Sequence, residues 1–217
     1  MVEVEDRPLG GRLLVLGGGG HAGVVLDTLR TMDSALLENA ALLDPNLTDQ
    51  AHGLPVIGGD DFLENACREG FGCFVLGLGG GTENNKRQGL FDRAKACGLT
   101  PVSVIHASAE VSPSADLGEG VVIFARAVVN AHSKVGENVI LNTASVIEHD
   151  CQIADHVHIA PRACLLGGVV AGDRAFVGAG SIVRQGLSIG ADAVVGCGAV
   201  VIKDVPPGAT VYGNPAV

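Results

Sequence analysis

A histidine between two acids, Glu148-His149-Asp150, is the part of this chain best suited to acid–base chemistry. A carboxylate that accepts a hydrogen bond from one ring nitrogen fixes the imidazole tautomer and raises the basicity of the other nitrogen. His149 is therefore the candidate general base, with Asp150 and Glu148 as its flanking acids. Asn142 precedes His149 closely enough along the chain to share this catalytic site or a subunit interface.

The other histidines carry less information. His158 follows His149 within the same stretch of chain and is placed to face the same cleft. A zinc site made of His149, His156 and His158 has no suitably placed cysteine, so no metal site is expected. Surface positions without a role in chemistry are expected for His52, His106, His132 and His156.

A repeat of six residues must position this constellation. An aliphatic residue recurs at every sixth position from Ile105 to Val201, and only Ala171 among them is small. A fixed short period indicates a stacked solenoid. An α-helix would instead spread these residues around its surface. The repeat therefore predicts a hexapeptide parallel β-helix in which every sixth side chain points inward.

The chain before residue 105 has a different pattern, in which strands alternate with helices. Strands are expected at 12–16, 40–43, 73–76 and 102–105, and helices at about 21–32, 60–69 and 82–97. This alternation predicts a small parallel α/β sheet, similar to half of a Rossmann fold. The expected organisation is an α/β domain at 1–104, a β-helix at 105–205 and a C-terminal tail at 206–217.

The glycine turn after the first strand is the second candidate site. Residues 18–23 (GGGHAG) match the GxGxxG pattern, and Asp44 lies near the distance expected of a ribose-binding acid. About a hundred residues supply only one mononucleotide-binding half, so we reject a dinucleotide site. Amides at a helix N-terminus bind phosphate, which favours a single nucleotide diphosphate. A turn that serves only close packing of strand and helix is the alternative.

Composition excludes several other classes of function. The formal net charge of −10 argues against nucleic acid or an anionic membrane as a partner. No apolar run approaches the length of a membrane span, and the first residues lack the apolar core of a signal peptide. The cysteines are scattered without a CxxC pair, so reduced thiols and a cytoplasmic location are expected.

Several short motifs together point to one family. They are GGGGH at 17–21, IH at 105–106, SPSA at 112–115, LNT at 141–143, VIEHDC at 146–151, His158, GG at 167–168 and YGNPA at 212–216. With them, nearly the whole chain resembles the sialic-acid O-acetyltransferase/bacillosamine N-acetyltransferase family of two-domain, trimeric sugar acyltransferases. Hexapeptide repeats occur in many acyltransferases, whereas GGGGH combined with IEHDC is much more specific.

This resemblance implies a left-handed β-helix with three hexapeptides per coil. Residues 18 apart then stack, so His149 lies between Ala131 and Gly167 and has room beside its ring for a ligand. The resemblance also implies that the cleft lies between the subunits of a homotrimer.

Roles for individual residues follow from the same resemblance. The histidine matching His149 is the general base in such proteins, and the acid matching Asp150 raises its basicity. The implied acetyl-CoA site consists of His158 and main-chain groups near Gly167, Ala179 and Cys197. The nucleotide-sugar is implied to lie against Gly19, Gly20 and His21, with Asp44 and Pro45 near the base or ribose. The segment 77–81 is longer than in the family, and nucleotide identity is expected to be decided there.

These features predict an N-acetyltransferase that uses acetyl-CoA, without a metal, in polysaccharide biosynthesis. Its expected acceptor is the 4-amine of a UDP- or GDP-linked 4-amino-4,6-dideoxy sugar. The same base acting on a hydroxyl would make the protein a sialic-acid O-acetyltransferase, which is the main alternative. A trimeric scaffold or nucleotide sensor without catalysis is the other alternative, and an imidazole flanked by acids argues against it.

Overall fold

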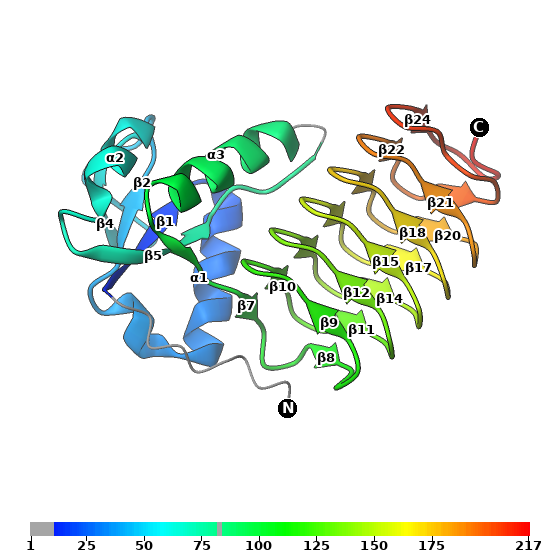
Figure 1. Ribbon diagram of the computed structural model, residues 1–217, viewed down its shortest axis with the longest axis horizontal. Coiled ribbons are helices and arrows are strands. Elements are labelled where there is room, and N and C mark those ends of the chain that lie inside the picture. Colours follow the sequence, from blue (N-terminus) through cyan, green and yellow to red (C-terminus); the bar gives the residue numbers. More distant parts are fainter. Residues whose placement is uncertain (1–10, 82–83) are drawn as a thin grey trace.

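The computed structural model describes residues 11–81 and 84–217, which form an α/β domain and a triangular prism of short parallel strands (Figure 1). This is the predicted fold class, a small α/β sheet followed by a left-handed parallel β-helix. Within the described ranges, no helix combines the length and the apolar character needed to cross a bilayer.

The α/β domain is built on a six-stranded sheet of order β3-β4-β2-β1-β5-β6. Its strands are β1 (Arg12–Leu16), β2 (Ala41–Leu43), β3 (Gln50–Ala51), β4 (Leu54–Gly58), β5 (Phe71–Leu76) and β6 (Thr100–Pro101). Its helices are α1 (Gly20–Met32), η1 (Ser34–Leu37), η2 (Asp60–Phe62), α2 (Leu63–Ala66) and α3 (Asn84–Ala96). Among the described strands only β3 runs antiparallel, against β4, so the predicted parallel sheet carries one hairpin at its edge.

Two elements of this domain differ from the prediction. The expected helix at 60–69 ends early, and Gly70, with φ of 84°, turns the chain into β5. The hairpin of β3 and β4 was not predicted, because β4 contains Pro55 and Gly58, two residue types that are depleted from strands. Proline is tolerated near the edge of a sheet, which is where β4 lies.

The prism has three faces of stacked two-residue strands. Face 1 comprises β7 (Val104–Ile105), β10 (Val122–Ile123), β13 (Ile140–Leu141), β16 (His158–Ile159), β19 (Phe176–Val177), β22 (Val194–Val195) and β24 (Thr210–Val211). Face 2 comprises β8 (Glu110–Val111), β11 (Val128–Val129), β14 (Val146–Ile147), β17 (Cys164–Leu165), β20 (Ile182–Val183) and β23 (Val200–Val201). Face 3 comprises β9 (Asp116–Leu117), β12 (Lys134–Val135), β15 (Gln152–Ile153), β18 (Val170–Ala171) and β21 (Ser188–Ile189).

The predicted periodicity is confirmed by the pairing of the strands. Leu141 pairs with Ile123 in the coil before it and with Ile159 in the coil after it, so 18 residues (141 − 123) complete one coil. These inward side chains belong to one continuous apolar core and are 0% exposed. The corners repeatedly place a residue near φ of +60°, as at Asp150 (60°) and Gly168 (69°). Glycine and short polar residues tolerate this left-handed region best.

The ends of the prism differ from the expected boundaries. β7 already begins at Val104, and β24 pairs with β22 on face 1. Part of the expected tail at 206–217 is therefore a further strand of the prism.

The three corners are named by the faces they join. Corner 1–2 includes residues 142–145, 160–163, 178–181 and 196–199, corner 2–3 includes 148–151 and 166–169, and corner 3–1 includes 136–139, 154–157 and 172–175.

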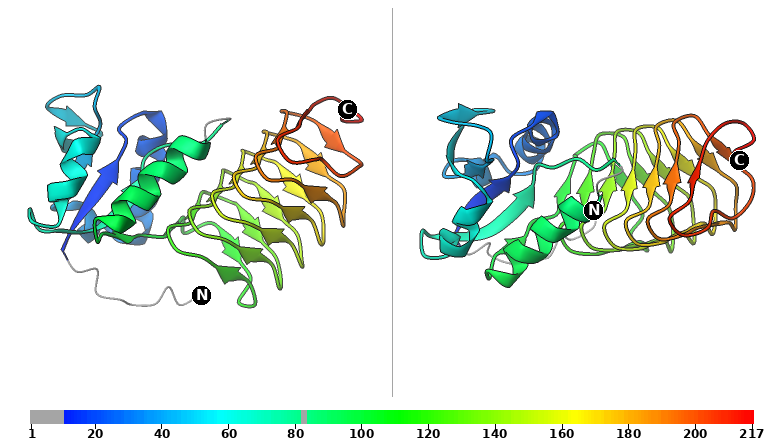
Figure 2. Two further views of the ribbon diagram at one scale, coloured as in Figure 1. Left: turned by 45° about the horizontal axis from the view of Figure 1, so that its top comes forward. Right: turned by 90° about the horizontal axis from the view of Figure 1, so that it is seen from above.

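The α/β domain covers face 1 and corner 3–1 of the first coils (Figures 1 and 2). Residues of α1 share one core cluster with the outer side chains of face 1: Val25, Leu26, Leu29, Val104, Val122 and Ile140. Along corner 3–1, Lys95 of α3 forms ion pairs with Glu119 and Glu137. Corner 2–3 is opposite face 1 in the triangular section, so it lies on the far side of the prism from this domain.

Candidate active site

His149 lies on corner 2–3, between β14 and β15, with its ring exposed to solvent. Its Nδ1 lies 2.7 Å from Oδ2 of Asp150, and the two side chains are 63% and 62% exposed. A carboxylate oxygen accepts in such a pair, so Nδ1 carries the proton and Nε2 is the free basic nitrogen. The predicted pairing of His149 with Asp150 is thus present, and it leaves a base that is open to a ligand.

Gly167 lies beside the ring of His149, one coil further along the prism. A Cβ built on Gly167 would lie 2.6 Å from both Cε1 and Nε2 of His149. Any side chain here would displace the imidazole. The ring itself takes up the space that Gly167 leaves, and the expected room for a ligand beside it stays a prediction.

Glu148 has a different role from Asp150. Its Oε2 accepts a hydrogen bond from Nδ2 of Asn130 at 3.0 Å. Its carbonyl oxygen accepts from Oγ of Ser133 at 2.7 Å, and that hydroxyl accepts from the amide of Cys151 at 3.1 Å. These bonds hold the backbone of corner 2–3. Of the two flanking acids, Asp150 is the one that orients the imidazole.

His158 and Asn142 form a second cluster on another side of the prism. His158 on face 1 is 4% exposed. Its Nδ1 donates to the carbonyl of Gly80 at 2.6 Å, and its Nε2 accepts from Nδ2 of Asn142 at 3.2 Å. Burial, followed by the charge of Arg87, lowers the pKa of His158 to about 3, so the ring is neutral at pH 7. Within one chain Asn142 is joined to His158, because β14 separates its corner from that of His149; the predicted sharing of a site or a subunit interface with His149 stays a prediction.

His21 also belongs to the second cluster. Its ring meets that of Phe124 edge to face, with centroids 5.2 Å apart. Burial, followed by the charge of Arg87, lowers the pKa of His21 to about 4. His21 thus faces the prism on the side opposite corner 2–3, away from His149 of the same chain.

The glycine turn is open where the ligand is expected. A Cβ built on Gly19 or Gly20 would meet nothing within 4 Å. α1 begins at Gly20, and its N-cap residue Gly19 offers no side-chain hydrogen bond to the first turn. Amides at such a helix end are available to an anion.

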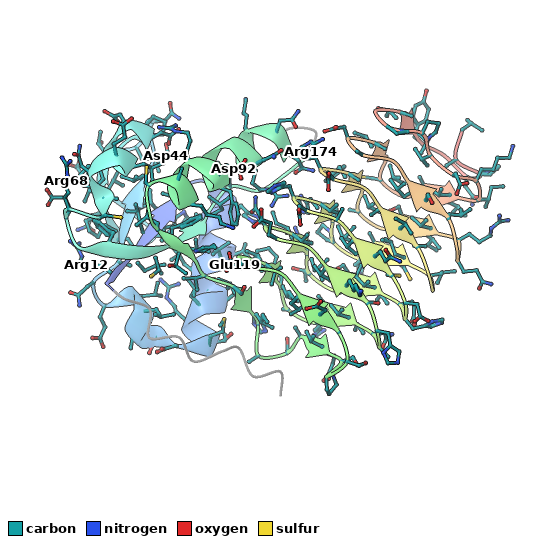
Figure 3. All side chains as sticks on the ribbon, viewed as in Figure 1. Arg12, Asp44, Arg68, Asp92, Glu119 and Arg174 are labelled. Carbon is teal, nitrogen blue, oxygen red and sulfur yellow. The ribbon has the colours of Figure 1, made fainter. Side chains whose placement is uncertain are left out.

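Asp44 supports the turn from the end of β2 (Figure 3). Its Oδ2 accepts from the amide of Gly18 and its Oδ1 from the amide of Asn46, both at 2.8 Å. The predicted ribose contact would have to use the remaining lone pairs of this half-exposed carboxylate. Pro45, next to it, is exposed.

His52 lies between β3 and β4 and contacts the glycine turn. The sequence did not reveal this contact. Its Nε2 lies 3.0 Å and 3.1 Å from the carbonyl oxygens of Gly18 and Gly19. A single loop histidine has no spacing or motif that could indicate such a contact. Its predicted place at the surface is confirmed, since the residue is exposed.

The four residues implied for acetyl-CoA are divided by face 2: three lie towards face 1 and one lies on corner 2–3. Ala179 and Cys197 stack on corner 1–2, where the amide of Gly198 donates to the carbonyl of Ala179 at 2.8 Å. This corner borders face 1, which carries His158. Gly167 lies on corner 2–3 with His149. Within one chain, face 2 therefore separates the two halves of the implied donor site.

One group of side chains, Asp92, Glu137 and His156, brings its ligand atoms within 4.8 Å of one another. His156 is buried under α3, so its predicted solvent-facing position is wrong. Arg87 donates to Oδ1 of Asn138 at 3.0 Å, which leaves Nδ2 of that amide to donate to Nδ1 of His156, also at 3.0 Å. Nε2 then carries the proton of the neutral ring, and neither nitrogen is free to bind a cation.

Comparison with known proteins matches residues 12–94 to the family model described as the PglD N-terminal domain. Among solved structures, the chain is similar to a perosamine N-acetyltransferase of Caulobacter crescentus in complex with CoA and GDP-perosamine. That relative is 39% identical over 95% of this chain and 96% of its own, with a TM-score of 0.89.

Two further solved structures match almost the full length. The acetyltransferase domain of PglB from Neisseria gonorrhoeae, in complex with acetyl coenzyme A, is 36% identical over 96% of this chain and 98% of its own, with a TM-score of 0.88. WeeI from Acinetobacter baumannii is 28% identical over 95% of this chain and 98% of its own, with a TM-score of 0.86. No protein with a curated description matches significantly.

Proposed function

Because this chain belongs to the family of hexapeptide-repeat sugar N-acetyltransferases, we propose that it acetylates the 4-amine of a GDP- or UDP-linked 4-amino-4,6-dideoxy sugar. It is an acetyltransferase that uses acetyl-CoA and acts on a nucleotide-linked amino sugar. The assignment of the sugar and its amine rests on the relative whose structure contains CoA and GDP-perosamine. That relative is 39% identical to this chain. An enzyme with these two substrates fits polysaccharide biosynthesis in the cytoplasm.

The observation that carries the mechanism is the free Nε2 of His149, beside Gly167 and opposite the nitrogen that Asp150 engages. The amino sugar arrives as an ammonium ion, and its nitrogen must lose a proton before or during attack on the thioester. His149 takes that proton through Nε2, and Asp150 stabilises the imidazolium that results. The new C–N bond forms as the C–S bond breaks, and the nitrogen gives up a second proton as it becomes an amide. Of the two protons, one is taken up by the departing CoA thiolate and the other is released from His149 to water.

The acceptor enters this scheme through the glycine turn. The open amides at the start of α1 bind the diphosphate, and Asp44 and Pro45 lie at the adjacent strand end on the side of the nucleoside. His158, Ala179 and Cys197 line the path of acetyl-CoA along face 1 and corner 1–2. In one chain these groups and His149 lie on different sides of the prism, so one copy does not form a complete site.

The outer side chains of face 2 support a second copy at this place. Five of the six outer side chains of this face are apolar, namely Val128, Val146, Cys164, Ile182 and Val200, and Ile182 is 44% exposed; only Glu110 in the first coil is charged. The matching positions on face 3 are Asp116, Lys134, Gln152, Val170 and Ser188. An apolar stripe on a surface marks an interface. We propose that face 2 packs against a neighbouring copy in a homotrimer, which brings His149 of one chain to the acceptor and donor of the next.

A panel of acceptors tests the proposed function. Acetyl-CoA consumption is measured with UDP-, GDP-, dTDP- and CMP-sugars that carry either a free 4-amine or only hydroxyls. We expect turnover with a GDP- or UDP-linked 4-amino sugar and an N-acetyl product by mass spectrometry. Turnover of only CMP-linked or free sialic acid would contradict the proposal and favour O-acetylation. A protein that binds nucleotide-sugars without any turnover would be the non-catalytic scaffold.

A further inference from the structure

Three buried polar atoms without partners gather where α3, the segment after β5 and the prism meet. In the described part of the chain, the unpartnered buried side-chain atoms are His21 Nε2, Asn84 Oδ1, Arg87 Nε and Ser145 Oγ. The side chains of His21 and Asn84 lie beside Gly79 and Gly80, respectively, and Arg87 follows Asn84 on the first turn of α3. Buried polar atoms usually have partners, so a cluster of exceptions calls for a reason.

Arg87 locks α3 to the prism from inside this junction. Its side chain is 1% exposed. The guanidinium donates to the carbonyl oxygens of Asn138 and His156, and to that of Val157 at 3.3 Å. These acceptors are uncharged and belong to two successive coils of corner 3–1. Burying a guanidinium is energetically costly. Apolar contacts alone would hold the helix without this cost.

The glycine segment after β5 occupies the space between the two buried histidines. A Cβ on Gly79 would lie 3.3 Å from the ring of His21, and one on Gly80 would lie 2.1 Å from Oδ1 of Asn84 and 3.0 Å from Nδ1 of His158. The carbonyl of Gly80 accepts the hydrogen bond that fixes the tautomer of His158. The backbone therefore passes between these side chains only because it has none of its own.

The first turn of α3 holds this segment in place. Nδ2 of Asn84 donates to the carbonyl of Arg174 at 2.8 Å, and Arg87 is bound three residues later. Figure 3 shows Arg174 on the prism at the end of α3 that lies nearest the coils. The position of Gly80, and through it the ring of His158, thus depends on how α3 is docked.

The charge of Arg87 acts on the same two rings. After burial, it is the next cause that lowers the pKa of His21 to about 4 and that of His158 to about 3. Both rings are neutral at pH 7, so Nε2 of His158 keeps a lone pair and adds no positive charge beside an ammonium substrate.

We propose that Arg87 is a positioning residue for acetyl transfer: it docks α3 on corner 3–1 and holds Gly80 against His158, and its charge adds to the effect of burial on the two imidazoles. Arg87 itself touches neither substrate. The consequence for acetyl-CoA rests on the proposed contact of this co-substrate with His158. The state of the two rings is a property of the free protein and does not depend on the acceptor sugar.

The test compares Arg87→Met and Arg87→Lys with Arg93→Met, an exposed arginine of the same helix that donates to the carbonyl of Asp60 at 3.1 Å. Imidazole nitrogen NMR follows the titration of His21 and His158 in the ligand-free protein, and calorimetry measures the Kd of acetyl-CoA. We expect higher titration midpoints and an approximately tenfold weaker acetyl-CoA affinity in Arg87→Met. In Arg87→Lys the titration midpoints should return closer to wild-type values than the acetyl-CoA affinity does. Lysine keeps the positive charge that acts on the two rings, but it lacks the planar guanidinium that binds several carbonyl oxygens at once.

Gly80→Ala provides a second route if Arg87→Met does not fold. It keeps Arg87 but displaces the carbonyl from His158, so acetyl-CoA affinity should again fall about tenfold. Wild-type midpoints and wild-type affinity in a folded Arg87 variant would overturn the proposal, as would unchanged affinity in Gly80→Ala. Failure of every acceptor in the sugar panel would instead refute the proposed function, since these readouts require no sugar.

Discussion

His149 and His158 are both held through Nδ1, yet their surroundings give them opposite properties. His149 donates to a carboxylate on an exposed corner, whereas His158 donates to a carbonyl inside the domain junction. The exposed ring leaves its Nε2 open to a ligand. The buried ring, with a pKa lowered to about 3 by burial and then by Arg87, stays neutral and can only accept through Nε2. The place in the fold, rather than the residue type, is the reason that His149 is the proposed base.

The largest effect should come from His149→Ala. Loss of a general base lowers kcat by about 10²–10⁴-fold. Steady-state assays with acetyl-CoA and the accepted nucleotide-sugar would measure it. Near-normal turnover of this variant would contradict the assignment of His149, rather than another residue, as the general base.

Asp150→Asn tests the contribution of the carboxylate that accepts from Nδ1 of His149. The amide can no longer accept and stabilise charge as a carboxylate does, so kcat should fall by less than in His149→Ala, on the order of tenfold or more. Glu148→Gln is the matched control, because Glu148 bonds Asn130 rather than the ring. A greater loss in the glutamine variant would reverse the roles assigned to the two acids.

The separation of the two histidines within one chain predicts that activity requires assembly. Ile182→Asp places a carboxylate in the apolar stripe of face 2, and an unpaired charge buried at an interface costs several kcal/mol. Light scattering should show loss of the trimer, with activity falling at least tenfold in parallel.

Val170→Asp is the control for assembly, since Val170 is similarly exposed on face 3 (39% against 44% for Ile182). It should leave both the trimer and the activity intact. A fully active monomer of the wild-type protein would show that one chain completes the site by itself.

A smaller effect is expected at the acceptor end. Gly20→Val fills open space at the start of α1, where the diphosphate is proposed to bind. KM for the nucleotide-sugar should rise about tenfold, a loss of about 1.4 kcal/mol, while KM for acetyl-CoA changes little. Equal increases in both constants would indicate that the turn is only structural.

A separate effect concerns the stability of the fold against pH rather than activity. His21 and His158 have lowered pKa values in the folded protein, about 4 and about 3, against the ordinary histidine value of 6.5. The unfolded chain therefore binds more protons below pH 6.5, and stability is lost as the pH falls from there towards 4 and below. From pH 7 to pH 5 the free energy of unfolding should fall by on the order of 2 kcal/mol per histidine.

Thermal melts at fixed protein concentration would measure this dependence. His158→Gln should flatten it, whereas His132→Gln, a change at an exposed corner residue, should preserve it. An identical pH dependence in both variants would show that the buried ring is not its source.

The sequence alone was sufficient to predict the prism. A β-helix buries the same inward position in every hexapeptide, so an apolar residue recurs at every sixth position of the chain. The sequence also indicated the pairing of His149 with Asp150, since neighbours on a rigid corner need no distant partner. The glycine turn was predictable for the same reason: a strand, a turn and a helix are local.

Only the tertiary structure decided which side each residue occupies and what covers it. Within one chain, β14 separates the corners of Asn142 and His149 and places the amide against His158. His156 and His158 appear equivalent to exposed histidines in the repeat, until the α/β domain packs over them. Arg87 shows no signal in sequence because most of its acceptors are backbone carbonyls, which every residue possesses. Local periodicity determines the prism, whereas contacts between distant segments determine its chemistry.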